Sequence, residues 1–169
     1  MNLSVKLQGN EKLKGALGTL GDRAAESLAS ALYVEAELVM TDSKRLVDVD
    51  QGTLKSSAFV KPPQINRNAL DWSIEVEMGY GGAASGYAIF LHEGTGPNVG
   101  QPPFMPPVEP FKEWARRVLG DESLGFVIAR AVGARGLGPR KFLERPLMQK
   151  AATMGERIAA RLRRDLERR

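Results

Sequence analysis

Apolar residues recur every three or four positions along residues 11–44. This spacing places them on one face of an α-helix. Gly15, Gly18 and Gly21 each weaken a helix by about 1 kcal/mol relative to alanine, so we expect a broken start and a solid helix from about Asp22, the expected N-cap. The stripe consists of Leu13, Leu17, Leu20, Ala24, Leu28, Leu32, Ala36 and Val39.

The middle of the chain predicts a small sheet. Residues 70–78 alternate five apolar with four polar side chains, as in a strand with one buried face. Residues 57–61 are the expected partner strand, and residues 62–69 the hairpin loop between them, because Pro62-Pro63 stops the first strand. Residues 79–86 include four glycines and predict a flexible loop. Residues 87–91 are apolar throughout and fit either a buried strand or a short helix.

Six of the ten prolines fall between residues 97 and 110, which forbids a central strand or a continuous helix there. We expect a long loop or arm, followed by two short helices and a turn at residues 133–138. The chain is therefore predicted to be one domain, 1–169, with an insertion at about 96–137. The two helical faces are Phe111, Trp114, Ala115 and Val118, and Leu124, Val127, Ile128 and Ala131.

A last helix is predicted over residues 146–169. Its apolar stripe is Leu147, Ala151, Met154, Ile158, Leu162 and Leu166. Six arginines cover most of the remaining surface: Arg157, Arg161, Arg163, Arg164, Arg168 and Arg169. Long helices at both ends around a small antiparallel sheet, with a proline-rich helical insertion, predict the α+β class.

The amino-acid composition excludes several kinds of functional site. The chain has no cysteine and one histidine, which excludes disulfides, thiolate metal sites and multi-histidine sites. It has no apolar run long enough to span a membrane and no apolar signal core at its start, so we expect a cytoplasmic product unless it joins a particle. The net charge of +4 is compatible with nearby nucleic acid without requiring it.

Two short motifs resemble functional sites, but each lacks residues that the function would require. His92-Glu93 begins like a zinc-protease motif, and the second histidine is missing. Residues 94–100 are glycine-rich like a phosphate loop, but they lack the Lys-Ser/Thr ending, and Pro97 removes an amide donor. We therefore predict no metal, no cofactor and no phosphate loop, and interpret both as turns.

The remaining candidates are acidic residues for catalysis and arginines for nucleic-acid contact. A hydrolase would have to use Asp48, Asp50 or Glu93, and no spacing fixes a basic partner for them. Asp50 more simply brackets the turn at Gln51-Gly52. The arginine-rich last helix is the candidate for nucleic-acid contact, through phosphates at Arg157, Arg161 and Arg164 and without sequence readout. Its plain alternative is an amphipathic helix packed on the fold or on a neighbouring subunit.

Three strings in fixed order carry a resemblance to a known family. They are Val49-Asp50-Gln51-Gly52-Thr53-Leu54-Lys55-Ser56-Ser57, Tyr87-Ala88-Ile89-Phe90-Leu91-His92-Glu93-Gly94-Thr95, and Pro139-Arg140-Lys141-Phe142-Leu143-Glu144-Arg145-Pro146. Together they resemble the tail-completion and neck (head–tail connector) proteins of tailed phages. In that pattern the first string opens a strand, the second carries a strand into the Glu-Gly-Thr turn, and the third begins the last helix. Gln51 departs from the threonine usual in the family.

The resemblance implies a structural virion protein without enzymatic activity. It implies a ring of identical subunits in the neck, around the DNA channel, between the portal or an adaptor (stopper) protein and the tail tube or its terminator. It also implies motif or subunit-interface roles for eleven residues: Asp50, Gly52, Leu54, Ser57, Tyr87, Glu93, Gly94, Phe104, Pro139, Phe142 and Leu143. A tail terminator and a nucleic-acid-binding protein remain the alternative interpretations.

Overall fold

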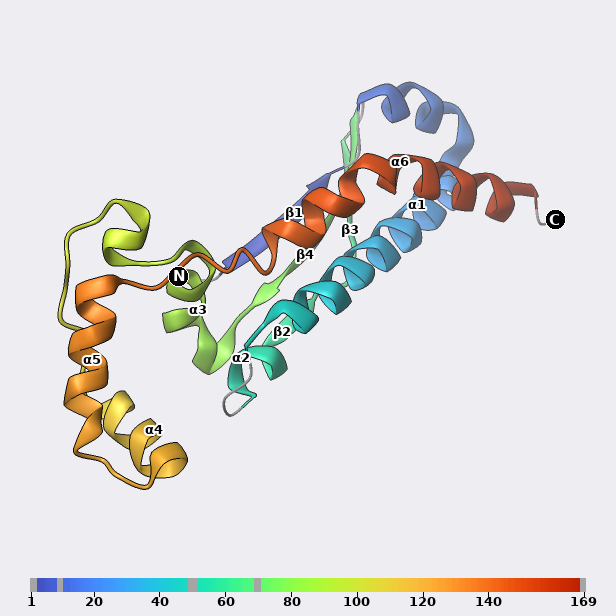
Figure 1. The fold of residues 1–169 in the computed structure, drawn as a ribbon. Coiled ribbons are helices and arrows are strands. Elements are labelled where there is room, and N and C mark those ends of the chain that lie inside the picture. The colour runs from blue at the N-terminus through green and yellow to red at the C-terminus, as the bar shows by residue number, and fades with distance from the viewer. Residues whose placement is uncertain (1–2, 9–10, 49–51, 69–70, 168–169) are drawn as a thin grey trace. The chain divides into compact units, whose positions relative to one another are not determined.

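The computed structural model describes residues 3–8, 11–48, 52–68 and 71–167, and the chain forms two compact units. The first unit comprises residues 1–88 and 142–169, and the second comprises residues 89–141. The predicted insertion, residues 96–137, lies within the second unit. The α+β class is confirmed, with a small antiparallel sheet, long helices near both ends and a proline-rich helical insertion (Figure 1).

The sheet of the first unit is built around one central strand, β4 (Asp71–Tyr80). β1 (Leu3–Gln8) pairs antiparallel with one edge of β4. β2 (Ala58–Val60) and β3 (Gln64–Asn68) pair with β4 one after the other. Glu75 is opposite residues of both β1 and β3, so these two strands lie on opposite edges of β4.

The predicted alternation in the central strand is confirmed where side chains are described. Ile74, Val76, Met78 and Tyr80 are buried, and Glu75 is half-buried between them. The hairpin loop predicted at residues 62–69 is wrong, because residues 64–68 form β3. Strand β1 was not predicted either. Leu70 lies outside the described residues.

The N-terminal helix α1 (Glu11–Leu46) is broken as predicted. Gly21 has φ 71° and ψ −169°, which interrupts the helix. The predicted cap, Asp22, is not among the described side chains. From there on the predicted apolar stripe is buried, and a further set of small and apolar residues of the helix is buried beside it: Ala25, Ala29, Ala31 and Met40.

Helix α1 is buried on more than one side because it packs against both β4 and the last helix, α6 (Glu144–Glu167) (Figure 1). Many of its buried positions are alanines, and short side chains allow neighbouring elements to approach closely. Ser43 is completely buried, and its hydroxyl shares a 2.8 Å hydrogen bond with the hydroxyl of Tyr80. Burial raises the pKa of the Tyr80 phenol, while the bond to Ser43 opposes that shift.

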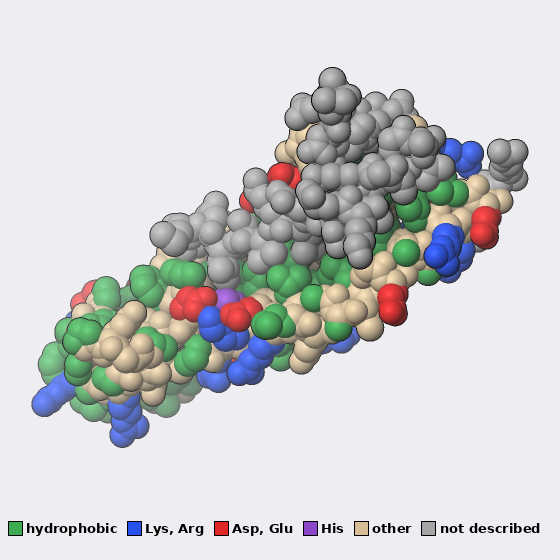
Figure 2. Space-filling view, turned by 90° about the horizontal axis from the view of Figure 1, so that it is seen from above, with side chains coloured by type: hydrophobic (Ala, Val, Ile, Leu, Met, Phe, Trp, Pro, Cys, Tyr) green, Lys and Arg blue, Asp and Glu red, His purple; other side chains and the backbone are tan. Residues whose placement is uncertain are grey.

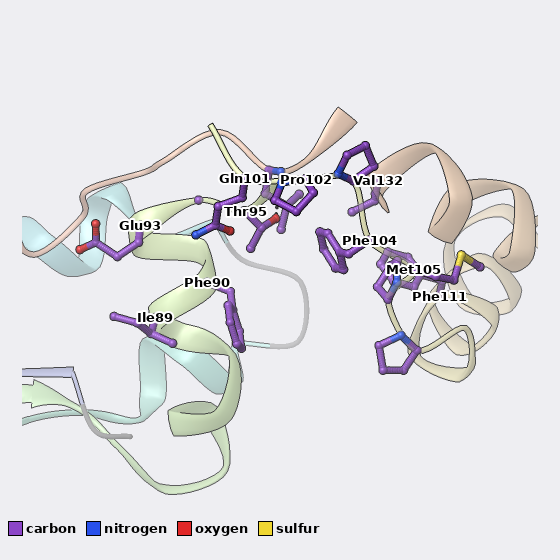
Figure 3. A pocket seen from close by; sticks show the side chains of 15 residues that line it. Ile89, Phe90, Glu93, Thr95, Gln101, Pro102, Phe104, Met105, Phe111 and Val132 are labelled. Atoms are coloured by element: carbon purple, nitrogen blue, oxygen red, sulfur yellow. Dashed lines mark hydrogen bonds between the residues drawn. The ribbon is translucent and has the colours of Figure 1, made fainter. Parts of the chain in front are cut away.

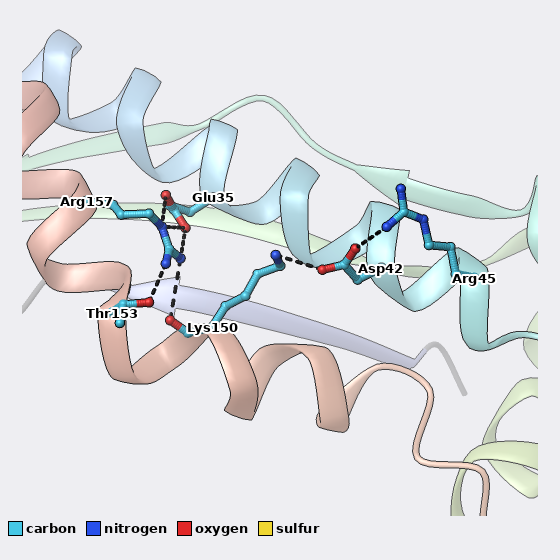
Figure 4. Close-up of polar contacts among 6 residues, drawn as sticks. All are labelled: Glu35, Asp42, Arg45, Lys150, Thr153 and Arg157. Carbon is cyan, nitrogen blue, oxygen red and sulfur yellow. Dashed lines mark hydrogen bonds and ion pairs between the residues drawn. The ribbon is translucent and has the colours of Figure 1, made fainter.

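Ion pairs fasten α6 to α1 (Figure 4). The guanidinium Nε of Arg157 donates to both carboxylate oxygens of Glu35 at 2.9 and 3.1 Å, and a second nitrogen also donates to that carboxylate. Lys150 Nζ lies 2.7 Å from Asp42, and this contact lowers the pKa of the Asp42 carboxyl despite its partial burial. Nearer the end of α6, Ser27 donates to Asp165 at 2.7 Å.

Arg157→Ala is expected to destabilise the first unit. Glu35 is only 5% exposed, so removing its arginine leaves a buried carboxylate without its main partner. The expected loss is about 1–3 kcal/mol, measured as the free energy of unfolding in urea. Arg164→Ala is the matched control, since Arg164 is exposed on the same helix and should change stability by less than about 0.5 kcal/mol. Equal stability of the two variants would contradict the structural role of the pair.

The first of the three strings forms a short helix rather than the start of a strand. Gly52, with φ 78°, precedes α2 (Thr53–Ser56), and β2 begins only after Ser57. Leu54 is buried, and the Ser57 hydroxyl donates to the Leu54 carbonyl at 2.8 Å. Asp50 and Gln51 lie outside the described residues.

The second string is also helical. Residues 85–93 form α3 (Ser85–Glu93), preceded by the 3₁₀ turn η1 (Gly82–Ala84), so the strand that the resemblance implied for this string is not observed, and the loop predicted at 79–86 is wrong. β4 itself extends to Tyr80. Of the two interpretations of the apolar run at 87–91, the short helix is the one observed.

Candidate assembly surface in the second unit

The second unit is built from short helices on a proline-rich segment. After α3 come the 3₁₀ turn η2 (Gly96–Val99), an irregular segment over residues 101–107, and the helices α4 (Glu109–Leu119) and α5 (Leu124–Arg135). The long irregular segment and the two helices are confirmed. The turn predicted at residues 133–138 begins later, because α5 continues to Arg135.

Close backbone contacts hold this unit together. Gly94 has φ 82°, and a Cβ there would lie 2.7 Å from the Leu137 carbonyl. Next to it, Thr95 and Leu137 exchange backbone hydrogen bonds of 2.9 and 3.1 Å. Gly136 lies against the Thr95 carbonyl in the same bridge. These contacts fix both ends of the proline-rich chain to each other.

The face of α5 that packs inside the unit consists of very small residues. Gly125, Ala129 and Gly133 are buried and spaced by four, which places them on one side of the helix. A Cβ on Gly125 would lie 2.5 Å from the Lys112 backbone of α4, and one on Gly133 would lie 1.8 Å from the Phe104 carbonyl oxygen. The glycines therefore allow α4 and the proline segment to lie directly on α5.

This packing covers the expected apolar face of α4 only in part, because Ala115 is buried while Phe111 and Trp114 are half-buried. Most of the expected apolar face of α5 is exposed. Val118 on α4 is 52% exposed, and Phe126 and Val127 on α5 are 53% and 61% exposed. Leu119 and Leu124, on either side of the turn between the helices, are also exposed. Figure 2 shows hydrophobic side chains at the surface of this unit. We call Val118, Leu119, Leu124, Phe126 and Val127 the apolar ridge.

A second apolar feature is a concave groove of about 740 Å³, all of whose lining residues belong to the second unit. We call it the proline groove (Figure 3). Phe90 on α3 and Phe104 on the proline segment lie on its two sides. Phe90, Phe104 and Met105 are 53%, 41% and 51% exposed, and the prolines at 102, 103, 106 and 107 form much of its wall.

One carboxylate, Glu93, also lines the groove. Its oxygens accept hydrogen bonds from Lys141 Nζ and lie 2.9 Å from His92 Nδ1. The contact with Lys141, followed by that with His92, lowers the pKa of the Glu93 carboxyl. Glu93 is about half exposed, so it is a surface ion pair at the edge of an apolar groove.

The Glu93 contact predicts a pH dependence. A carboxyl whose pKa is lowered in the folded state stabilises that state above its unfolded pKa, and this stabilisation is lost as pH falls through the folded pKa. Lys141→Met should therefore reduce stability more at about pH 7 than at about pH 3, because part of the stabilisation is already lost once the pH is below the ordinary pKa of a glutamate. Unfolding in urea at both pH values measures this, and an equal effect at both would contradict the ion pair.

The remaining residues named from the sequence fall into three groups. Leu54, Phe142 and Leu143 are buried in the first unit and belong to its core. Gly52 and Gly94 have positive φ at helix ends, Ser57 is the C-cap of α2, and Pro139 lies in the irregular stretch before α6, with its nitrogen close to Gly94. Tyr87, Glu93 and Phe104 are accessible at the surface. Of the three arginines, Arg157 is held by Glu35, whereas Arg161 is half-buried and Arg164 is exposed.

The exposed residues Phe90, Met105, Phe126 and Val127 were not recognised from the sequence. The signal was present in α5 for Val127, which lies two positions before Ala129 and therefore about 160° around the helix from the glycine–alanine–glycine face. The spacing gives no such signal for Phe126, which lies only about 60° from Ala129 and is nevertheless exposed.

Comparisons of the chain with protein-family models, curated proteins and solved structures gave no match. No helix among the described residues is both long enough and apolar enough to cross a membrane.

Proposed function

We propose that the protein is a structural subunit of a tailed-phage neck. In this role identical subunits form a ring around the DNA channel, joining the portal or adaptor to the tail tube, and the protein works without catalysis or cofactor. The virion neck would be its final location.

The observation that carries this proposal is the apolar surface of the second unit. Monomeric proteins seldom expose contiguous apolar patches larger than a few hundred Å². A unit of residues 89–141 that exposes both the apolar ridge and the proline groove is typical of a subunit made to be covered. The phage neck in particular is supported by the order of the three strings.

Oligomeric state is the direct test. Mass photometry of the full chain, alone and mixed with purified portal complexes or tail tubes, is expected to show a ring or co-assembly with one of them. Binding to portal complexes would support the neck position. Binding only to the end of tail tubes would favour the tail-terminator alternative. A chain that stays monomeric with both partners would refute the proposal.

Contact with channel DNA is a second candidate role, favoured by the basic side of α6. Arg163 and Arg164 are exposed and Arg161 is half-buried, and none of the three forms an ion pair with another described residue. Phosphate contacts release counterions, so binding should weaken steeply with salt. Arg161→Ala combined with Arg164→Ala should then reduce both affinity and salt dependence, and unchanged binding to duplex DNA would remove this role.

A further inference from the structure

The geometry of the second unit points to a specific self-contact: we propose that the apolar ridge of one copy inserts into the proline groove of a second copy. This inference rests on the proposed ring and names the surfaces that would form it. The partner is another copy of this chain, and each copy gives its ridge to one neighbour and its groove to the other.

Helix α5 contributes to both features on different sides. Val132 lines the groove, whereas Phe126 and Val127 belong to the ridge. With 3.6 residues per turn, Phe126 lies roughly 120° from Val132 in one direction around the helix axis and Val127 roughly 140° in the other direction. A copy therefore cannot place its own ridge in its own groove, and contacts can be made with two different neighbours.

The available area suits a contact of the size that interfaces need. The eight large side chains of the ridge and groove are between 39% and 61% exposed. Three of them are phenylalanines, which present on the order of 150–250 Å² each when free, and the five Val, Leu and Met side chains are smaller, so together they would bury on the order of 500 Å² of apolar surface. Polar atoms make up about 40% of an interface, so the total approaches the roughly 1,000 Å² expected of a specific contact.

The shapes also favour this pairing over pairing of like surfaces. A groove of about 740 Å³ can receive several side chains, and the ridge offers Phe126 and Val127, which point about 100° apart around the axis of α5. Exposed side chains that enter a groove elsewhere on the same molecule make a heterologous contact, which closes into a ring when the rotation allows it.

The test uses two full-length variants under the conditions in which wild type assembles, alone or on a partner complex. The ridge variant carries Phe126→Glu and Val127→Glu, and the groove variant carries Phe90→Glu and Met105→Glu. Each should weaken assembly tenfold or more, because a carboxylate would enter an apolar contact. Met148→Glu is the matched control, since Met148 is 68% exposed on α6 in the first unit and should not affect assembly.

Mixing the two variants distinguishes a heterologous from an isologous contact. The ridge variant keeps an intact groove and the groove variant keeps an intact ridge, so the mixture should form a 1:1 dimer that grows no further. Assembly of both variants like wild type would overturn the groove–ridge contact and leave the neck proposal standing. A wild type that is monomeric alone and with every partner would overturn both.

Cross-linking gives an independent readout without charged substitutions. The chain has no cysteine, so Val127→Cys and Met105→Cys each introduce a unique thiol. A short bismaleimide should join the two variants in a mixture far more efficiently than it joins either variant to itself. Cross-linking no more efficient than with Met148→Cys in place of either variant would overturn the proposal.

Discussion

Gly133→Ala is expected to detach the proline segment from α5. The added Cβ would lie 1.8 Å from the Phe104 carbonyl oxygen and 2.9 Å from Pro106 Cδ, so the segment must move. The hydrogen bond from the Phe104 amide to the Gly133 carbonyl, 3.1 Å long, would be lost with it. The combined cost is about 2–4 kcal/mol.

The direction of the stability change distinguishes the steric clash from the ordinary effect of a glycine-to-alanine substitution in a helix. Glycine to alanine inside a helix ordinarily stabilises by about 0.5–1 kcal/mol. Gly155→Ala is the matched control, because Gly155 is inside α6 and a Cβ there meets nothing within 4 Å. Urea unfolding, with hydrogen exchange of the Phe104 amide, should show Gly133→Ala destabilised and Gly155→Ala unchanged or stabilised. Stabilisation by Gly133→Ala would mean that the segment does not lie on α5.

Phe142→Ala is expected to be at least as damaging to the first unit. Phe142 is 1% exposed, and its ring meets that of Tyr80 edge-on with centroids 5.1 Å apart. Truncation removes this contact and leaves a cavity in the core, which costs about 3–5 kcal/mol. The free energy of unfolding in urea measures the loss.

The control for Phe142 is Met148→Ala, which changes an apolar residue of α6 that is 68% exposed. It should change stability by less than about 0.5 kcal/mol. The comparison also separates two roles for the Phe-Leu pair of the third string. Truncating a core residue to alanine lowers the stability of the isolated chain. Truncating an interface residue would weaken assembly and leave that stability intact. A stable Phe142→Ala variant with impaired assembly would contradict the core position.

The fold was predictable wherever a periodic pattern was strong. The helical stripe of α1 and the alternation of β4 each extend over several turns or residue pairs, so the predicted face and the buried face agree. The broken start of α1 followed from the low helix propensity of glycine, and the break lies at Gly21.

The errors lie where the pattern was weak. β3, with the sequence Gln-Ile-Asn-Arg-Asn, has a single apolar residue, Ile65, which is opposite Ile74 of β4. It forms a strand because it pairs with β4, and its own sequence has no alternation of apolar and polar residues that would predict this. The apolar run in α3 fits either period over five residues, so only the tertiary structure decides between strand and helix.

The assembly surface could be predicted only in part, because exposure depends on what packs where. Large apolar residues in α4 and α5 indicate a core-facing stripe by their spacing alone. In the structure the packed face of α5 belongs to Gly125, Ala129 and Gly133, because only residues without long side chains allow the Lys112 backbone and the Phe104 carbonyl so close. Because these small residues form the packed face, Val127 on the opposite side of the helix is at the surface.

The proline segment has a thermodynamic consequence for any association at the groove. Proline fixes φ at four of the seven positions from 101 to 107, so little backbone entropy remains to be lost when a partner binds. Calorimetry of binding should then show a negative heat-capacity change proportional to the apolar area covered, without the larger change that accompanies folding of a disordered segment. The groove would therefore act as a preformed binding surface.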